Sequence, residues 1–370
     1  MLIGVPTNSS GTADGVARAP AVLRQRGLTG ALAGCPGFTD AGDLALDAPW
    51  PGRGPSGLLA EAALITTIGR VREAVGAARR LGRFPLLVGG DCPVILGALA
   101  ALQAERDRPG LLFVDGHEDA WPPRRSATGE AADCELGLAL RLFDAELAPG
   151  LRDVLPRIRA RDVIAVGPRD GDELAAAGVA TLAGQLRALI RPAELAAGGA
   201  AGADGLPGPW WLHTDLDVLA SAELAAVDYP QPGGLTWNQL SDVTAAALAT
   251  AGSYSTDGGR TWSAPLRVTP DRDQAPHIVE SAGGRPGVAY VAWQTSGTGP
   301  GYATYLRPFS IQRGWLAPAV KVSAAYGNVR IWPGDTFGIA PLPDGSICLT
   351  WGSAVGARKT SAIYASVVTI

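Results

Sequence analysis

The sequence predicts an α/β domain with a mostly parallel sheet covered by helices on both faces, followed by an all-β domain. Up to about residue 251, short apolar runs alternate with longer amphipathic patterns, which indicates alternating strands and helices. Beyond it the runs are short and separated by Gly, Pro and Asp. Residue usage changes at the same place, because both lysines (Lys321 and Lys359) and half of the ten tryptophans follow it. We therefore predict two domains, over residues 1–251 and 252–370.

The elements of the first domain follow from their apolar periodicity. The longest helix is expected over residues 57–82, where apolar residues recur at i, i+3 and i+4. The expected strands are residues 1–6, 84–91, 110–116, 162–167 and 209–219, and the further helices are 93–105, 134–145, 182–196 and 236–250. Residues 197–209 are rich in Gly and Ala and are expected to form a surface loop.

The second domain shows no long helical pattern. Its β-rich runs are residues 287–295, 303–310, 319–324, 338–353 and 362–370. Turn residues such as "PDGS" within this part predict antiparallel hairpins.

The composition restricts the class of partner and the compartment. A formal net charge of −4 predicts no basic surface, so neither nucleic acid nor an anionic membrane is expected as a partner. No stretch reaches the ~20 apolar residues that span a bilayer, and "MLIGVPTNSSG" lacks the pattern of a secretory signal. The four cysteines form no CxxC pair and are expected to be reduced thiols in a cytoplasmic protein.

Polar side chains with metal-binding potential follow three of the predicted strands. They are Asp91 and Cys92 in "VGGDCP", Asp115, His117 and Asp119 in "VDGHED", and His213, Asp215 and Asp217 in "HTDLD". In open α/β sheets, ligands bind at the carboxyl ends of the strands, so the three sets can meet at one edge. Residues two apart in an extended segment point to the same side, so members of a set form a row.

Two interpretations of these rows are open. A single Asp-x-Asp after a strand is usually a loop cap, and a single histidine there is usually a hydrogen-bonded core residue. Carboxylates from several strand ends would, however, repel one another by several kcal/mol in a partly dry site, and divalent cations remove that repulsion. Mixed histidine and carboxylate ligands suit Mn, Fe or Zn better than Ca. We therefore expect a metal site.

Five segments together resemble the ureohydrolase family of arginases, agmatinases and formimidoylglutamases. They are "GVPTNSSGTADGVARAPAVLR", "GGDC", "DGHED", "HTDLDVL" and "PGGLTW". Their order and spacing are similar to those of the family across residues 1 to about 250. The resemblance implies an arginase-like three-layer domain and a site with two divalent ions, usually Mn²⁺.

The resemblance also implies which side chains hold the ions. One ion would be held by Cys92, Asp115, Asp119 and Asp215, and the other by Asp115, His117, Asp215 and Asp217. A hydroxide between the ions would attack the amidine or guanidine carbon, and Asp119 would be catalytic by moving its proton.

The resemblance further implies a small cationic guanidino or amidino substrate. The segment "GPRDGDE" is similar to the substrate side of the family site, which makes Asp172 a candidate contact. Thr128 and Glu130 are further candidates, although an ordinary loop is the favoured interpretation for both. A homo-oligomer is an open possibility.

Four departures from the family pattern bear on activity. Most relatives carry histidine in place of Cys92, which is either a thiolate ligand that favours softer ions such as Zn²⁺ or a buried thiol beside the site. The segment after "DGHED" holds no histidine, which argues against arginine as the substrate. Ala220 replaces a carboxylate of the usual "DVLDP" ending. After Ala251 the chain enters "SYSTDGGRTWSAP", so the domain is expected to lack its last, interior strand and to leave backbone groups without partners.

The second domain resembles a fragment of a sialidase-like β-propeller. "STDGGRTW" (residues 255–262) fits the Asp-box, in which Asp257 would bond backbone amides and Trp262 would pack under the hairpin. "RGWLAPAVKVS" and "GDTFGIAPLPDGSICLTWGS" are similar to further copies. A propeller has about 4–8 four-stranded blades, more than residues 252–370 can supply, so we expect a partial propeller.

Three functions are compatible with these features. The first is a metal-dependent hydrolase of C–N bonds in linear amidines or guanidines. The second is a catalytically silent chimera of two truncated domains with residual metal binding. The third is a carbohydrate-binding or sialidase-like module formed by the second domain. Metal analysis, turnover of guanidino compounds and glycan binding distinguish the three.

Overall fold

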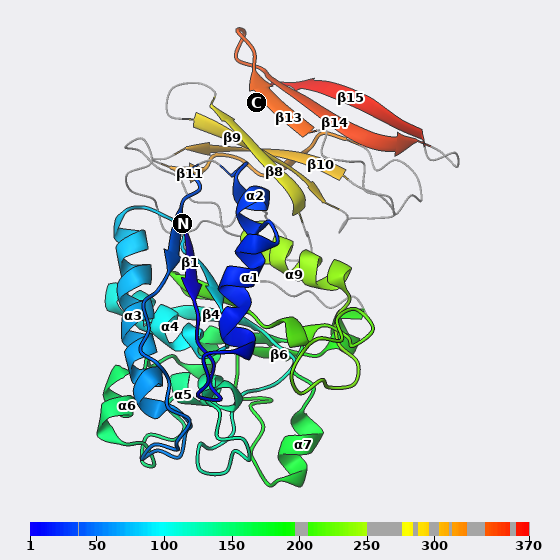
Figure 1. Ribbon diagram of the computed structural model, residues 1–370. Coiled ribbons are helices and arrows are strands. Elements are labelled where there is room, and N and C mark those ends of the chain that lie inside the picture. Colours follow the sequence, from blue (N-terminus) through cyan, green and yellow to red (C-terminus); the bar gives the residue numbers. More distant parts are fainter. Residues whose placement is uncertain are drawn as a thin grey trace. The chain divides into compact units, whose positions relative to one another are not determined.

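The structure is a computed structural model with two compact units, an α/β unit and a β unit. The described residues are 1–35, 37–196, 206–249, 276–283, 288–295, 303–310, 313–323, 337–355 and 360–369. The α/β unit contains the described residues up to Thr236, and the β unit contains those from Trp237 onward (Figure 1). The predicted domain boundary after residue 251 lies outside the described residues and stays a prediction.

Parallel strands form two sheets in the α/β unit (Figure 1). One has the strand order β2-β1-β3 and the other β6-β5-β4-β7, and all of these pairs are parallel. The strands are β1 (Leu2–Val5), β2 (Asp40–Asp43), β3 (Leu86–Gly89), β4 (Gly110–Val114), β5 (Val163–Val166), β6 (Ala188–Ile190) and β7 (Trp210–Thr214). The α/β class with parallel pairing is therefore confirmed.

Helices connect these strands, as expected for parallel pairing. They are α1 (Ala19–Gln25), α2 (Leu28–Leu32), α3 (Glu61–Arg80), α4 (Val94–Glu105), α5 (Glu135–Ala139), α6 (Pro149–Val154), α7 (Gly171–Ala176) and α8 (Pro192–Ala196). Short 3₁₀ turns are η1 (Gly15–Arg18), η2 (Ala131–Asp133), η3 (Ala160–Asp162) and η4 (Leu216–Val218). Gly97 of α4 lets α3 approach closely, because a Cβ there would lie 2.5 Å from Val71 and 2.7 Å from the Ile68 carbonyl.

The parallel strands of the α/β unit do not form one continuous sheet. The two sheets end at β3 and at β7, and these two strands do not pair with each other. Among the described residues, β3 pairs only with β1, and β7 pairs only with β4. Strands β1, β4 and β5 are buried throughout, whereas β3 is half-buried or exposed and β7 is mostly half-buried. The expected loss of an interior strand after Ala251 concerns residues outside the described ranges and stays a prediction.

The described residues of the β unit form one helix and two antiparallel sheets. Its sheets have the orders β11-β10-β9-β8, with β12 also paired to β10, and β13-β14-β15. The elements are α9 (Trp237–Ala249), β8 (Pro276–Gly283), β9 (Val288–Thr295), β10 (Ala303–Ser310), β11 (Gly314–Trp315), β12 (Val320–Lys321), β13 (Phe337–Pro341), β14 (Ile347–Val355) and β15 (Thr360–Val368). The turn between β13 and β14 is closed by Asp344, whose Oδ1 accepts the Ser346 N–H at 2.9 Å. Antiparallel pairing is confirmed.

The propeller interpretation of the β unit stays a prediction. The Asp-box at residues 255–262, with Asp257 and Trp262, lies outside the described residues. The described strands show antiparallel sheets, and such sheets occur in several all-β architectures besides propellers.

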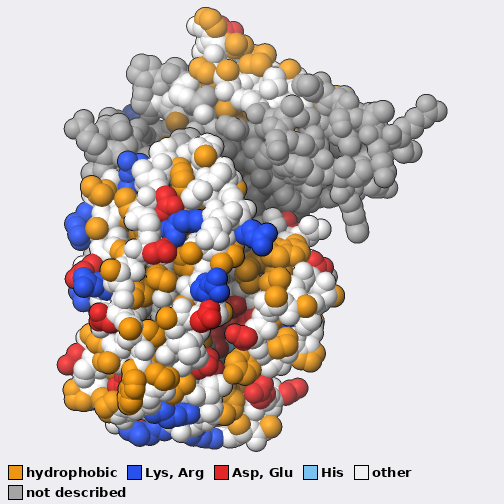
Figure 2. All heavy atoms as spheres, viewed as in Figure 1, with side chains coloured by type: hydrophobic (Ala, Val, Ile, Leu, Met, Phe, Trp, Pro, Cys, Tyr) orange, Lys and Arg blue, Asp and Glu red, His pale blue; other side chains and the backbone are white. Residues whose placement is uncertain are grey.

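Two helix predictions were wrong in part. Residues 182–196 were expected to form one helix, but they contain β6, which pairs with β5, and then the short α8. The helix expected over residues 134–145 is only α5. No helix within the described ranges is both long and apolar enough to cross a bilayer. On the face of the α/β unit that Figure 2 shows, basic and acidic side chains are interspersed rather than gathered by sign.

Candidate metal centre

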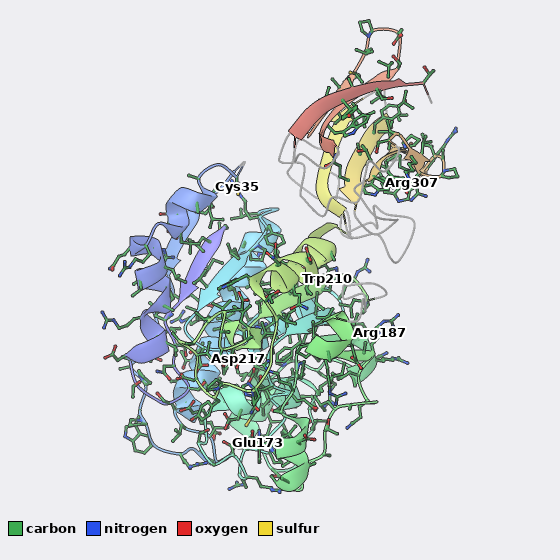
Figure 3. All side chains as sticks on the ribbon, turned by 90° about the vertical axis from the view of Figure 1, so that its right-hand side faces the viewer. Cys35, Glu173, Arg187, Trp210, Asp217 and Arg307 are labelled. Carbon is green, nitrogen blue, oxygen red and sulfur yellow. The ribbon has the colours of Figure 1, made fainter. Side chains whose placement is uncertain are left out.

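Three strand ends bring the predicted polar side chains together at one edge of the α/β unit. Val114 at the end of β4 lies opposite Thr214 at the end of β7, so Asp115 and Asp215 follow side by side. The Asp215 N–H donates to the Val114 carbonyl at 2.8 Å, which extends the pairing past the strand end. Trp210 at the start of β7 and Asp217 beyond its end are both labelled in Figure 3.

One group of donors, here called the outer cluster, consists of Asp115, His117 and Asp217, with donor atoms within 4.8 Å of one another. His117 Nδ1 lies 2.8 Å from Asp217 Oδ2 and 3.9 Å from Asp115 Oδ1. Burial lowers the pKa of His117, but the hydrogen bond and charge of Asp217 outweigh it and leave the pKa raised. The outer cluster is therefore a compact group of oxygen and nitrogen donors drawn from two strand ends, and Asp217 stands in it where the predicted row has Asp119.

Backbone amides fix the carboxylates of the outer cluster. The His117 N–H donates to Asp115 Oδ1, and the Gly116 N–H donates to Asp217 Oδ1, each at 2.9 Å. A Cβ on Gly116 would lie 2.8 Å from that Asp217 oxygen and 2.9 Å from the Asp217 carbonyl oxygen. The glycine of "DGHED" therefore allows the two strand ends to approach.

A second group, here called the inner cluster, consists of Cys92, Asp115, Glu135 and His213, with donor atoms within 4.8 Å of one another. His213 Nε2 lies 3.6 Å from Asp115 Oδ2. Glu135 Oε1 and Oε2, Asp115 Oδ2 and His213 Nε2 are buried without a hydrogen-bond partner among the described residues, apart from the Asp119 carboxyl beside Glu135. Asp115 belongs to both clusters, so the two groups are adjacent.

The predicted ligands Asp119 and Asp215 lie beside these clusters. Asp215 Oδ2 accepts a hydrogen bond from the Cys92 thiol at 2.6 Å, and Asp215 Oδ1 accepts the Asp217 N–H at 2.8 Å. Asp119 is buried and has a positive φ of 43°, which is uncommon for a residue with a side chain. All six predicted ligands are thus brought to one place, but the two donor groups contain four of them.

Burial dominates the electrostatics of the site. It raises the pKa of the Asp115, Asp119 and Glu135 carboxyl groups well above the usual range, and neighbouring acids raise the pKa of Asp115 and Asp119 further. Burial also raises the pKa of the Cys92 thiol and lowers the pKa of His213 to about 4, so that this imidazole is neutral at pH 7. A cation would stabilise the ionised acids and bind the neutral imidazole, so the donors fit a divalent metal.

The comparisons with known proteins agree with this arrangement. The sequence profile described as "Arginase family" matches residues 1–256. The chain belongs to the arginase family. Rabbit (Oryctolagus cuniculus) arginase-1 is 28% identical over 178 residues, which cover 46% of this chain and 54% of the relative. An N(omega)-hydroxy-L-arginine amidinohydrolase from Streptomyces lavendulae is 31% identical over 175 residues, covering 46% of this chain and 58% of the relative.

The chain spans a little more than half the length of the curated arginase-family relatives that it matches. The solved arginase from Bacillus caldovelox superimposes with a TM-score of 0.52 at 23% identity, over 65% of this chain and 83% of that one. At this identity the likeness shows the fold alone. Members of the arginase family hold two metal ions, typically Mn²⁺, and the clusters described above form a possible metal-binding site.

Arg169 supports this arginase-family site through backbone carbonyl groups. Among the described residues, none of its hydrogen bonds reaches the metal-binding atoms of either cluster. Its Nη2 donates to the Asp217 carbonyl at 2.8 Å and, more weakly, to the Leu219 and Gln231 carbonyls at 3.4 Å. The neighbouring Asp170 accepts the Glu118 N–H at 3.1 Å. The segment "GPRDGDE" therefore positions the loops that carry the clusters, a role that the sequence did not indicate.

The predicted substrate residues occupy different environments. Asp172 lies exposed in the first turn of α7. The Thr128 hydroxyl donates to Asp133 Oδ2 at 2.6 Å and accepts the Glu130 N–H at 2.9 Å, so it stabilises its own loop. Glu130 is half-buried, and burial first, then nearby carboxylates, raises its pKa to about 7.

Glu135 is a residue of the site that the sequence did not indicate. It is fully buried at the start of α5, directly after Cys134. The signal available was a single carboxylate at the start of an apolar run, "CELGLAL", where a charged residue costs free energy unless it is paired. His213 was noted on its strand, but only the structure shows its ring stacked on Phe113, with centroids 5.1 Å apart.

Proposed function

We propose that this arginase-family protein hydrolyses a C–N bond of a linear amidine or guanidine, with divalent cations held at the inner and outer clusters. The observation that carries the proposal is that two donor clusters share Asp115 at the carboxyl edge of a parallel sheet. A shared carboxylate is the arrangement that holds two cations a few ångströms apart, as two-metal hydrolytic sites require. Bound cations would lower the pKa of a coordinated water and supply the nucleophile.

The chain's own residues would position the reactants and move protons. The outer cluster is partly open, because the His117 and Asp217 side chains are 16% and 12% exposed, whereas Asp115 is 1% exposed. Reactants would therefore approach from the His117 side. Asp119, which is buried beside the clusters, would take the proton of the attacking water and deliver it to the leaving nitrogen.

The substrate class is inferred from the relatives. The matched proteins are named as arginases and as an N(omega)-hydroxy-L-arginine amidinohydrolase, and the solved arginase from Entamoeba histolytica is in complex with L-ornithine. We propose a small cationic guanidino or amidino compound as the substrate, with Mn²⁺ or Zn²⁺ as the ion. Asp172 and Glu130 remain the proposed contacts for the cationic group, and Asp172 is suited to it because its carboxylate is exposed.

Replacing the shared carboxylate tests this function. In Asp115→Asn, both clusters lose an anionic ligand, so turnover is expected to fall by at least about 100-fold. The assay is the release of urea or ammonia from a panel of guanidino and amidino compounds, after loading with Mn²⁺ and, separately, with Zn²⁺.

Asp162→Asn is the matched control for that experiment. Asp162 is a similarly buried aspartate that pairs with Arg108 at the opposite end of β5, so its replacement costs stability but leaves the clusters intact. The control is expected to keep turnover within about threefold of the parent. Turnover in the parent protein that Asp115→Asn leaves unchanged would contradict the proposal, as would no turnover on any compound with either ion bound.

A further inference from the structure

The inner cluster contains two side chains outside the ligand set that the family resemblance implies. Glu135 is fully buried beside the Asp119 carboxyl, and apart from that acid its carboxylate oxygens have no hydrogen-bond partner among the described residues. His213 Nε2 and Asp115 Oδ2 are buried and unpartnered in the same place. Each such group destabilises the folded protein when it is left unpaired, and more so when it is charged. Buried acceptors that face one another would be satisfied by a cation between them.

We propose that the inner cluster is a metal site in its own right, in which all four of its side chains are ligands. Its donors are one sulfur, one imidazole nitrogen and two carboxylate oxygens, all within 4.8 Å of one another. Four protein donors match the coordination number of tetrahedral Zn²⁺. A thiolate and an imidazole among them select Zn²⁺, or the chemically similar Co²⁺, over Mn²⁺.

The fold holds these four donors in place from three directions. Cys92 follows β3 and precedes α4, and its sulfur lies 2.6 Å from Asp215 Oδ2, which follows β7. The His213 ring stacks on Phe113 at an interplanar angle of 18°, which fixes the direction of Nε2. Glu135 comes from the start of α5. Such preorganisation lowers the cost of ordering ligands when an ion binds.

The charge of the donors supports Glu135 as a ligand. When ionised, the two clusters together supply one thiolate and three carboxylates. Their four negative charges equal the four positive charges of two divalent cations. These groups are Cys92, Asp115, Glu135 and Asp217. In the family-implied set, Asp119 and Asp215 take the places that Glu135 and His213 take here. The inference concerns metal binding alone, and it does not depend on turnover.

Cobalt titration of the full-length chain, freed of metal with a chelator, tests the ligand set. Binding at the inner cluster is expected to give a thiolate-to-cobalt charge-transfer absorption, because Cys92 supplies sulfur. Cys92→Ser should abolish this absorption, whereas Cys134→Ser, which replaces a fully buried cysteine outside the cluster, should retain it. Glu135→Gln should weaken Co²⁺ binding at least about 10-fold, whereas Asp162→Asn, at a buried aspartate away from both clusters, should change it by less than about threefold.

Two results would overturn the inference. One is cobalt affinity that survives in Glu135→Gln but is lost in Asp119→Asn, which would restore the family-implied ligand set. The other comes from X-ray absorption of the parent protein loaded with one equivalent of Zn²⁺, which should occupy the sulfur-containing inner cluster and needs no variant. One sulfur at about 2.3 Å and three nitrogen or oxygen neighbours at about 2.0–2.2 Å are expected, and a shell without sulfur would refute it. A protein that passes both tests but hydrolyses nothing would contradict only the proposed function.

Discussion

At the scale of single residues, Glu130 makes stability depend on pH. Burial first, and then the charges of Asp91 and Asp133, raise its pKa from 4.5 to about 7. The folded protein therefore binds this proton more tightly than the unfolded chain does, and Glu130 lowers stability as pH rises from about 4.5 to 7. Glu130→Gln has no proton to lose, so at pH 8 it should be more stable than the parent by about 1 kcal/mol, a value reduced because solvent reaches the side chain.

Urea unfolding of the metal-free proteins at several pH values measures this effect. The stability difference between Glu130→Gln and the parent should grow from pH 5 to pH 8, with little difference at pH 4.5. A difference that is constant across this range would show that the carboxyl group does not titrate as its surroundings imply.

The site residues also show which part of a metal centre the sequence predicts. Asp115 and His117 follow β4 and Asp217 follows β7, and the parallel pairing of these two strands brings the three side chains to one edge of the sheet. Glu135 lies on α5, and its approach to Asp115 depends on how that short helix packs, which no local pattern encodes. The sequence therefore predicts donors on strands better than donors on intervening loops and helices.

At the scale of elements, one buried hydroxyl connects the starts of two helices. Glu61, the first residue of α3, accepts the Ser56 N–H at 2.7 Å and the Ser56 hydroxyl at 2.8 Å. The same hydroxyl accepts the Ala148 N–H, which precedes α6, at 2.9 Å. Ser56→Ala would leave the amide and one carboxylate oxygen unpaired in a buried place, so we expect a loss of about 2–3 kcal/mol in unfolding free energy.

Thr66→Ala is the matched control for Ser56→Ala. The Thr66 hydroxyl donates to the Ala62 carbonyl within α3, 3.2 Å away, and that carbonyl is accessible to solvent. Its removal should change the unfolding free energy by less than about 0.5 kcal/mol. Equal effects of the two substitutions in urea unfolding would argue against a linking role for Ser56.

The elements that the sequence predicted correctly are those with long, strongly periodic patterns. α3 and α4 lie within the predicted ranges because their apolar residues recur at helical spacing over several turns. β6 was missed because it has only three residues, and the leucines before it, Leu182 and Leu186, fit a helical spacing. These residues form a strand because β6 pairs with β5, for example Leu189 with Ala165. That pairing joins residues far apart in the sequence, so no local pattern predicts it.

At the scale of the whole α/β unit, β3 and β7 have the sequences of interior strands but lie at sheet edges among the described residues. "PLLVGG" and "PWWLHT" are continuous apolar runs, which are typical of strands covered on both faces. Leu86 of β3 is nevertheless 37% exposed, and the preceding Phe84 is 72% exposed. Edge strands open more easily than interior ones because one row of their backbone groups has no strand partner. Exposing these apolar strands at an edge costs free energy. That cost destabilises β3, which precedes Cys92, and β7, which contains His213.

Metal binding should lower that cost, because the inner cluster joins the ends of the two sheets. Cys92 follows β3 of one sheet, whereas Asp115 follows β4 and His213 lies in β7 of the other. In hydrogen exchange followed by mass spectrometry, amides of β3 and β7 in the metal-free protein should exchange at least about 100-fold faster than those of β4 and β5. Zn²⁺ at about 100 times its dissociation constant should slow exchange in β3 and β7 by up to about 100-fold, since an ion that binds only the closed form contributes about 2.7 kcal/mol. Protection that rises equally in every strand would instead indicate that the ion stabilises the unit as a whole and does not hold the divided sheet together.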